Sequence, residues 1–429
     1  MAVDDLIREE DVPSVPAEEY ASRYSDVRQL TERLCEPLCP EDCVIQSMPD
    51  TSPTRWHLAH VTWFFETFVL SKGLQDYTPF RADFSYLFNS YYNSIGQPFA
   101  RPNRGLLSRP TVEEIFEYRR AVDQRMQEFL RESKLDRVAP LLPVVEIGLH
   151  HEQQHQELLL TDIKHVFSCN PLYPTYRERS TQASPEISPL SWSSNEGGIG
   201  WIGHEGSDFA FDNESPRHKV WLDPFLLANR LSTNEEYLRF IEDDGYARPE
   251  LWLSAGWNQV CEQGWTSPLY WIKQDDGWSN FTLSGLRSMA PSEPVCHISF
   301  FEADAFARWS KARLPTEREW ESAAQNLKIQ GRFVEESAFH PLPISDEAND
   351  RPSQMFGDVW EWTSSDYSAY PGYQPLEGAL GEYNGKFMCN QYVLRGGSCV
   401  TPKSHIRRTY RNFFPTESRW QFSGIRLAQ

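Results

Sequence analysis

Residues 151–155 read His-Glu-Gln-Gln-His and stand inside a segment, 143–167, whose apolar residues recur at helical spacing. Two histidines four residues apart on a helix project from one face, close enough to bind one metal ion. The same five residues match the H-E-x-x-H signature of zinc metalloproteases, in which the glutamate is the general base. The stretch therefore predicts a metal-binding helix, and it leaves the metal and the chemistry open.

Three segments upstream also carry apolar residues at helical spacing: 16–35, 56–72 and 111–134. Together with 143–167 they predict an up-and-down four-helix bundle. The connection 73–110 is rich in Tyr, Asn, Gly and Pro and is too long for a plain bundle turn. Long loops in compact domains tend to be functional, so side chains of the site are expected there.

The composition changes after this helical half. Residues 170–196 are rich in Pro, Ser and Thr, which is typical of a linker. Beyond them the sequence predicts short strands, Gly turns and only short helices, at 232–243, 299–311 and 316–326. At 429 residues the chain is too long for one ordinary domain, and we expect an α+β protein of two domains. The predicted division is 1–175 for the helical domain, 176–196 for the linker and 197–429 for the irregular α/β domain.

The charge balance excludes two classes of partner. The chain has 41 Lys and Arg against 61 Asp and Glu, a net charge of −20, so no nucleic acid or anionic membrane is expected as a partner. Residues 1–8 contain no apolar run, so no signal peptide is expected, and no stretch is apolar enough to cross a bilayer. Eight thinly spread cysteines suit a reduced, cytoplasmic protein.

Two histidines do not complete a metal site, so a third ligand is required. His57 and His60 lie three residues apart in the segment 56–72, and ligands on facing helices of a bundle converge in its core. One of the two can complete a three-histidine site. A protease of the metzincin pattern would need glycine at 158 and histidine at 161, where this chain has Leu158 and Thr161.

Short motifs in both halves of the chain carry a family resemblance. In the N-terminal half they are Trp-His-Leu-Ala-His at 56–60 and the stretch at 151–155. In the C-terminal half they are Phe-Asp-Asn-Glu-Ser-Pro-Arg-His at 211–218, Arg-Leu-Pro-Thr-Glu-Arg-Glu-Trp-Glu at 313–321, Gly-Asp-Val-Trp-Glu-Trp-Thr at 357–363, Leu-Arg-Gly-Gly-Ser at 394–398 and Gly-Ile-Arg-Leu at 424–427. With these motifs the chain resembles the ergothioneine-biosynthesis sulfoxide synthases, also called hercynine oxygenases. Those enzymes couple a DinB-like four-helix domain to a domain of the formylglycine-generating-enzyme, C-type-lectin-like fold.

Most of the C-terminal motifs also have a plain structural interpretation, such as a capped helix start at 314–317, so we expect them to serve the fold. One departure from the formylglycine-generating enzymes is informative. Those enzymes place two cysteines shortly after the Arg-Gly-Gly-Ser motif, whereas here Cys399 stands alone and residues 400–406 contain none. The resemblance therefore implies that the fold is kept without the paired-thiol copper site.

The resemblance implies a non-haem iron enzyme that uses O2 to join cysteine, or γ-glutamylcysteine, to C2 of hercynine, the betaine of histidine, as a sulfoxide. By resemblance His60, His151 and His155 are the Fe(II) ligands. His57 stands where other members of the family carry a different residue, so we expect it to support a ligand and not to bind the metal itself. An iron held by only three histidines keeps open positions for substrate and O2.

The resemblance also assigns the substrate contacts. Gln154 is expected to hydrogen-bond the hercynine imidazole. Asn412, Phe413 and Phe414 are expected to bind the betaine end, since aromatic faces attract quaternary ammonium groups.

For the thiol substrate, the resemblance points to Arg101 and Arg104 as carboxylate contacts, because the guanidinium fork matches a carboxylate. The tandem Tyr91 and Tyr92 are expected to serve O2 activation and favour free cysteine as the donor, with Tyr383 as the alternative catalytic tyrosine.

Three alternative functions stay open from the sequence. An ovothiol-type synthase would attack unmethylated histidine at C5 instead of hercynine. A zinc hydrolase would use Glu152 as its base. A non-enzymatic binding module is the third alternative, because related C-terminal folds include carbohydrate binders.

Overall fold

The computed structural model describes residues 17–179, 186, 189–344 and 351–429, so residues 1–8 and part of the predicted linker lie outside the described residues. The chain divides into two compact units. The N-terminal unit comprises Met1–Cys169 with Pro375–Tyr383, and the C-terminal unit comprises Asn170–Gln374 with Asn384–Gln429. The N-terminal unit ends at Cys169, where the sequence predicted 175, and it also includes Pro375–Tyr383, which is remote in sequence from the rest of that unit.

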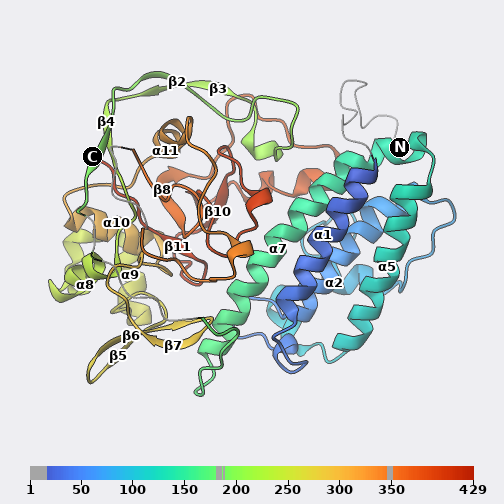
Figure 1. The fold of residues 1–429 in the computed structure, drawn as a ribbon, viewed down its shortest axis with the longest axis horizontal. Helices are drawn as coiled ribbons and strands as arrows, with labels where there is room; N and C mark the ends of the chain where they lie inside the picture. The colour runs from blue at the N-terminus through green and yellow to red at the C-terminus, as the bar shows by residue number, and fades with distance from the viewer. Residues whose placement is uncertain (1–16, 180–185, 187–188, 345–350) are drawn as a thin grey trace. The chain divides into compact units, whose positions relative to one another are not determined.

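Four long helices build the N-terminal unit: α1 (Ala17–Cys35), α2 (Thr54–Phe65), α5 (Val112–Glu132) and α7 (Leu142–Ser168). A π-helical turn (Glu66–Leu70) and α3 (Ser71–Gly73) extend α2, and two short helices, α4 (Phe84–Phe88) and α6 (Leu135–Val138), lie in the connections. Helices α1 and α2 each pack against both α5 and α7, so the four run side by side as a bundle (Figure 1). The predicted helical bundle is confirmed.

Helix α2 forms the centre of this bundle, because every residue from Thr54 to Phe65 is buried. Close approach to α7 depends on Gly148, where a Cβ atom would stand 2.5 Å from the ring of Phe65. A side chain on α2 that faces α7 therefore lies in the core, away from solvent.

The C-terminal unit holds short strands and short helices, as predicted. Its main sheet has the order β10-β9-β8-β11, and the smaller sheets are β1-β4, β2-β3 and β5-β6-β7. The strands are β1 (Trp192–Asn195), β2 (Gly198–Ile202), β3 (His218–Leu222), β4 (Phe225–Ala228), β5 (Trp271–Gln274), β6 (Gly277–Thr282), β7 (Gly285–Ser288), β8 (Trp360–Asp366), β9 (Gln391–Arg395), β10 (Asn412–Pro415) and β11 (Ser423–Gly424). The helices are α8 (Asn234–Glu242), α9 (Ser254–Gln263), α10 (Phe300–Trp309) and α11 (Glu317–Ala324).

The three predicted short helices are α8, α10 and α11, and each begins at a capping box. Thr233, Ser299 and Thr316 accept the backbone N–H three residues on, and a glutamate at that position returns a hydrogen bond. The α+β class of the chain is confirmed.

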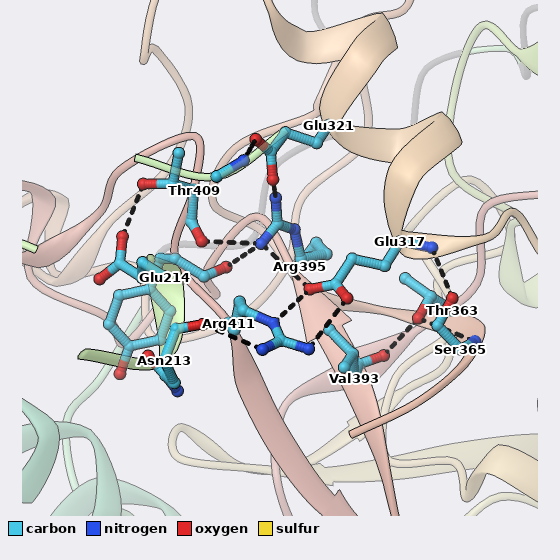
Figure 2. A network of polar contacts seen from close by, with 12 residues as sticks. Asn213, Glu214, Glu317, Glu321, Thr363, Ser365, Val393, Arg395, Thr409 and Arg411 are labelled. Carbon is cyan, nitrogen blue, oxygen red and sulfur yellow. Dashed lines mark hydrogen bonds and ion pairs between the residues drawn. The ribbon is translucent and has the colours of Figure 1, made fainter. Parts of the chain in front are cut away.

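A buried charge network joins several of the C-terminal motifs (Figure 2). The Arg395 guanidinium donates to the backbone carbonyl of Thr409 at 2.8 Å and pairs with Glu321. Arg411 donates to both carboxylate oxygens of Glu317, at 2.7 and 3.1 Å. Buried charges persist when they are paired, so these motif residues serve the fold, as expected. Strand β10 starts directly after Arg411.

Among the described residues, every helix is too short or too polar to pass through a bilayer.

Candidate metal centre

Three histidines converge in the core of the N-terminal unit, one from α2 and two from α7. Their potential ligand atoms all lie within 4.8 Å of one another. The ring centroids form a near-equilateral triangle: 4.9 Å from His60 to His151, 4.8 Å from His60 to His155 and 4.7 Å from His151 to His155. The structure therefore brings together the three residues that the sequence singled out as ligands.

The electrostatics of this triangle favour a metal over protons. Burial and the charge of His151 lower the pKa of His60, burial and the same neighbour lower that of His155, and burial lowers the pKa of His151 to about 3. All three imidazoles are thus neutral at pH 7 and offer lone pairs. Three neutral imidazoles at this spacing fit iron, zinc or copper.

The ring of His60 is held on both faces and at one nitrogen. Trp56 stacks on it at 4.6 Å and Trp63 at 5.8 Å, with interplanar angles of 14° and 17°. Its Nδ1 lies 2.6 Å from the carbonyl oxygen of Phe88, so Nδ1 carries the hydrogen. The lone pair is therefore on Nε2, which lies 3.1 Å from Nε2 of His151.

Glu152 faces away from this triangle. Its carboxylate accepts from Arg28 at 2.8 Å, from Arg119 at 2.7 Å and from the Thr31 hydroxyl at 2.6 Å. Burial raises its pKa, but Arg119 and Arg28 outweigh burial and lower the pKa to about 2. A carboxylate held by two arginines in the core is no general base, which removes the role that the zinc-protease hypothesis requires.

A tyrosine cluster adjoins the triangle. The Tyr383 hydroxyl donates to the Gln154 side-chain oxygen, and its ring lies 5.6 Å from that of His151. The Tyr91 ring lies 6.1 Å from Tyr383 and 4.8 Å from Tyr92. Burial raises the pKa of both Tyr91 and Tyr92, so both keep their hydroxyl proton at neutral pH.

The two tandem tyrosines differ in access. Tyr92 is fully buried and packs against Phe68 at 5.1 Å, whereas Tyr91 is half-buried. Tyr91 is thus the more accessible member of the pair.

The segment that carries Tyr383 is anchored by its neighbour. The Glu382 carboxylate accepts from the backbone N–H groups of Asn93 and Ser94, both at 3.0 Å, and from the Ser94 hydroxyl at 2.6 Å. These residues follow the tandem tyrosines directly. The anchor therefore ties the Tyr383 segment to the loop 73–110, a link that the sequence could not reveal.

The two candidate arginines of the loop have different surroundings. Arg101 is exposed, and Arg104 is 1% exposed with its guanidinium carbon 3.3 Å from the Trp56 ring centroid. Arg104 donates to the hydroxyls of Ser52 at 2.8 Å and Ser90 at 3.1 Å, and no carboxylate of the described residues pairs with it. Burial and then the charge of Arg101 lower its pKa to about 8. A buried cation paired only with neutral groups favours an incoming anion.

The predicted betaine contacts lie in the C-terminal unit, on β10. Phe413 stacks on Tyr367 at 4.0 Å with an interplanar angle of 12° and lies 5.9 Å from Phe387. Phe414 meets Trp420 edge-on at 6.1 Å, and the Asn412 side chain accepts the Phe413 N–H at 2.9 Å. All three are half-buried, so they are not sealed core residues.

Both halves of the chain match known protein families. Residues 23–159 match the DinB superfamily, and residues 194–349 and 352–429 match the sulfatase-modifying factor enzyme 1-like domain. The formylglycine-generating enzyme of Thermomonospora curvata is 26% identical over 50% of this chain and 89% of its own length.

Two relatives span almost the whole chain. The hercynine oxygenase of Mycolicibacterium thermoresistibile is 30% identical over 96% of this chain and 94% of its own length. The hercynine oxygenase of Mycobacterium tuberculosis is 30% identical over 96% of this chain and 98% of its own length. The chain therefore belongs to the hercynine oxygenase family of enzymes.

Proposed function

We propose that this enzyme joins a cysteine thiol to C2 of hercynine and oxidises the sulfur to a sulfoxide, with O2 as the oxidant, in ergothioneine biosynthesis. The imidazole C–H and the thiol S–H bonds break, a C–S bond and an S–O bond form, and the second oxygen atom leaves as water. The two substrates supply all four electrons that O2 takes up, so no external reductant is required.

The observation that carries the proposal is the triangle of His60, His151 and His155 in a chain of this family. We propose Fe(II) as the resident metal, because iron held by three imidazoles supplies redox and O2 chemistry with open positions for two substrates. The chain's own contribution is to keep these imidazoles neutral, with His60 and His151 buried and His155 half-buried.

Arg101 and Arg104 are proposed to hold the carboxylate of the thiol substrate. The buried guanidinium of Arg104, which stacks on Trp56 beside His60 and forms no ion pair with the described residues, supports this role. We propose that Arg101, which is exposed, adds a second cation and meets the substrate first.

The betaine end of hercynine is proposed to bind at Asn412, Phe413 and Phe414. The aromatic stack of Phe413 on Tyr367 offers the kind of face that attracts a trimethylammonium group. Gln154 is proposed to hydrogen-bond the substrate imidazole, and the Tyr383 hydroxyl orients its amide.

Tyr91 and Tyr92 are proposed to deliver the proton that O2 reduction consumes. Tyr91, half-buried and protonated, is the member that touches the reacting groups, and Tyr92 supports it. The tandem pair favours free cysteine over γ-glutamylcysteine as the thiol donor. Tyr383, beside His151, is the alternative proton donor.

The proposed partners are these small molecules only, since a net charge of −20 opposes nucleic acids and anionic membranes. The eight cysteines are thinly spread along the chain, and on that ground we propose a reducing, cytoplasmic location.

Product analysis by mass spectrometry tests the function. Enzyme loaded anaerobically with Fe(II) and then given O2, hercynine and cysteine should yield the C2-linked sulfoxide, and the His60→Ala variant should yield none. Replacing hercynine by histidine tests the ovothiol-type alternative, which predicts a C5-linked product. Absence of a sulfoxide with either thiol donor and with either imidazole would overturn the proposal.

A further inference from the structure

His57 lies against a triangle histidine without belonging to the triangle. Its Nδ1 is 2.8 Å from Nδ1 of His155, with ring centroids 5.1 Å apart, and the side chain is 4% exposed. The two rings therefore share one hydrogen between two nitrogen atoms, with His57 buried and His155 half-buried.

The other nitrogen of His57 is bound by a carboxylate. Its Nε2 lies 3.0 Å from Oδ2 of Asp162, which is also 4% exposed. The same oxygen accepts the backbone N–H of Ser52 at 2.8 Å, just before α2 begins. Asp162 follows His155 by seven residues on α7, two helical turns along the same face.

The Asp162 carboxylate, at the end of this series of hydrogen bonds, determines which nitrogen atoms of His57 and His155 carry hydrogen. A carboxylate only accepts, so Nε2 of His57 carries the hydrogen and its Nδ1 is left with a lone pair. The hydrogen shared by the two Nδ1 atoms then belongs to His155. Nε2 of His155 is consequently left with its lone pair available to a metal.

We propose that Asp162 and His57 are positioning residues that fix the tautomer and ring plane of His155 for metal binding. The inference rests on the proposed function only in that a metal occupies the histidine triangle. A carboxylate commonly orients a metal-binding histidine directly. Here the carboxylate acts through a second histidine, and it joins α7 to the start of α2, the two helices that supply the ligands.

The other two histidines show why this pair matters. Nδ1 of His60 is held by a backbone carbonyl, and no hydrogen bond of the described residues reaches Nδ1 of His151. The orientation of His155 thus depends on the side chains of His57 and Asp162, which can be substituted without replacing any of the three metal ligands.

The test is metal affinity measured without turnover. Anaerobic titration with Co(II), followed by its visible absorption, and with Fe(II), followed by calorimetry, gives a Kd for each variant. His57→Phe keeps the ring volume but removes the acceptor, and we expect a Kd raised roughly 10- to 100-fold. His57→Gln keeps an acceptor oxygen for His155 and should stay within about threefold of the unmodified enzyme.

Asp162 gives a second, independent pair. Asp162→Ala removes the acceptor and should weaken binding like His57→Phe, whereas Asp162→Asn retains an oxygen for both donors and should preserve most of the affinity. His150→Phe is the matched control, because His150 is a buried histidine on the same helix that pairs with Glu146, and its Kd should not change.

Equal Kd values for His57→Phe and the unmodified enzyme would overturn the inference and leave the three-histidine site standing. An equal loss of metal affinity in His57→Phe and His57→Gln, or in the two Asp162 variants, would also overturn the inference. It would show that the hydrogen-bond acceptor does not determine the affinity. An unmodified enzyme that binds neither ion would instead defeat the proposed function.

Discussion

Substitution of Glu152 tests whether this residue stabilises the fold or takes part in the chemistry, because it lies between two proposed iron ligands in sequence. The Glu152→Gln substitution removes the charge and retains the shape of the side chain. Arg28 then keeps Asp123 as a partner at 2.6 Å, and Arg119 keeps Glu32 at 3.2 Å. Both guanidinium groups lose their shared buried carboxylate.

The magnitude follows from the pKa of this carboxylate. A pKa of about 2 in the folded protein, against an ordinary 4.5, corresponds to a stabilisation on the order of 3 kcal/mol at about 1.4 kcal/mol per pKa unit. Breaking a buried ion pair by removing one partner costs about 3–5 kcal/mol, which agrees. We therefore expect Glu152→Gln to lower the free energy of unfolding by about 3 kcal/mol at pH 7.

The pH dependence has a definite sign. A depressed carboxyl pKa stabilises the fold above the unfolded value of 4.5, and this contribution is lost as the pH falls through 2. The stability difference between the unmodified protein and Glu152→Gln should thus be constant near neutrality and shrink from pH 4.5 downward.

Urea denaturation followed by circular dichroism measures this difference at each pH, with Co(II) affinity of the folded variant as a second readout. A loss of less than about 1 kcal/mol at pH 7, or a difference that grows in acid, would refute the reasoning. A Glu152→Gln variant that is as stable as the unmodified protein but has lost catalytic activity would indicate that Glu152 takes part in the chemistry.

Three further predictions concern other parts of the N-terminal unit. Arg104→Met should raise the KM for the thiol substrate at least about tenfold and change kcat less. Arg109→Met, at an exposed arginine of the same loop, should change neither constant. Equal kinetics of the two variants would contradict the carboxylate role. Tyr91→Phe should lower kcat at least about tenfold, whereas Tyr383→Phe should chiefly raise the KM for hercynine, and the reverse pattern in steady-state kinetics would make Tyr383 the proton donor. Gly148→Val should lower the free energy of unfolding by about 1–3 kcal/mol in urea titrations, because its Cβ would overlap a phenylalanine ring of α2, and an unchanged midpoint would show that the helices can separate.

Helical periodicity predicted the bundle closely. The segment 143–167 corresponds to α7 at Leu142–Ser168, and 111–134 corresponds to α5 at Val112–Glu132. The segment 56–72 was predicted as one helix, but a π-helical turn interrupts it at Glu66–Leu70. A π turn changes the hydrogen-bond spacing without changing composition, so apolar periodicity cannot reveal it. Glu66 is buried there and accepts from the Tyr118 hydroxyl at 2.6 Å.

The candidate site was predictable where it depends on spacing within one helix or on paired motifs. His151 and His155 follow from helical spacing, and the same rule would have found Asp162, which was missed. The Glu382 anchor could not be predicted, since it joins residues 289 and 288 positions apart through tertiary structure alone. The burial of Arg104 against Trp56 was also invisible, because neighbouring Arg101 has the same chemistry and is exposed.

Isotopically labelled O2 provides the most direct measurement on the proposed reaction. Fe(II)-loaded enzyme with hercynine and cysteine under labelled O2 should give a sulfoxide that contains one labelled oxygen atom, without added reductant, and zinc-loaded enzyme should give none. A sulfoxide oxygen that comes from water, or equal product formation with zinc in the site of His60, His151 and His155, would contradict iron-dependent oxygenation at this centre.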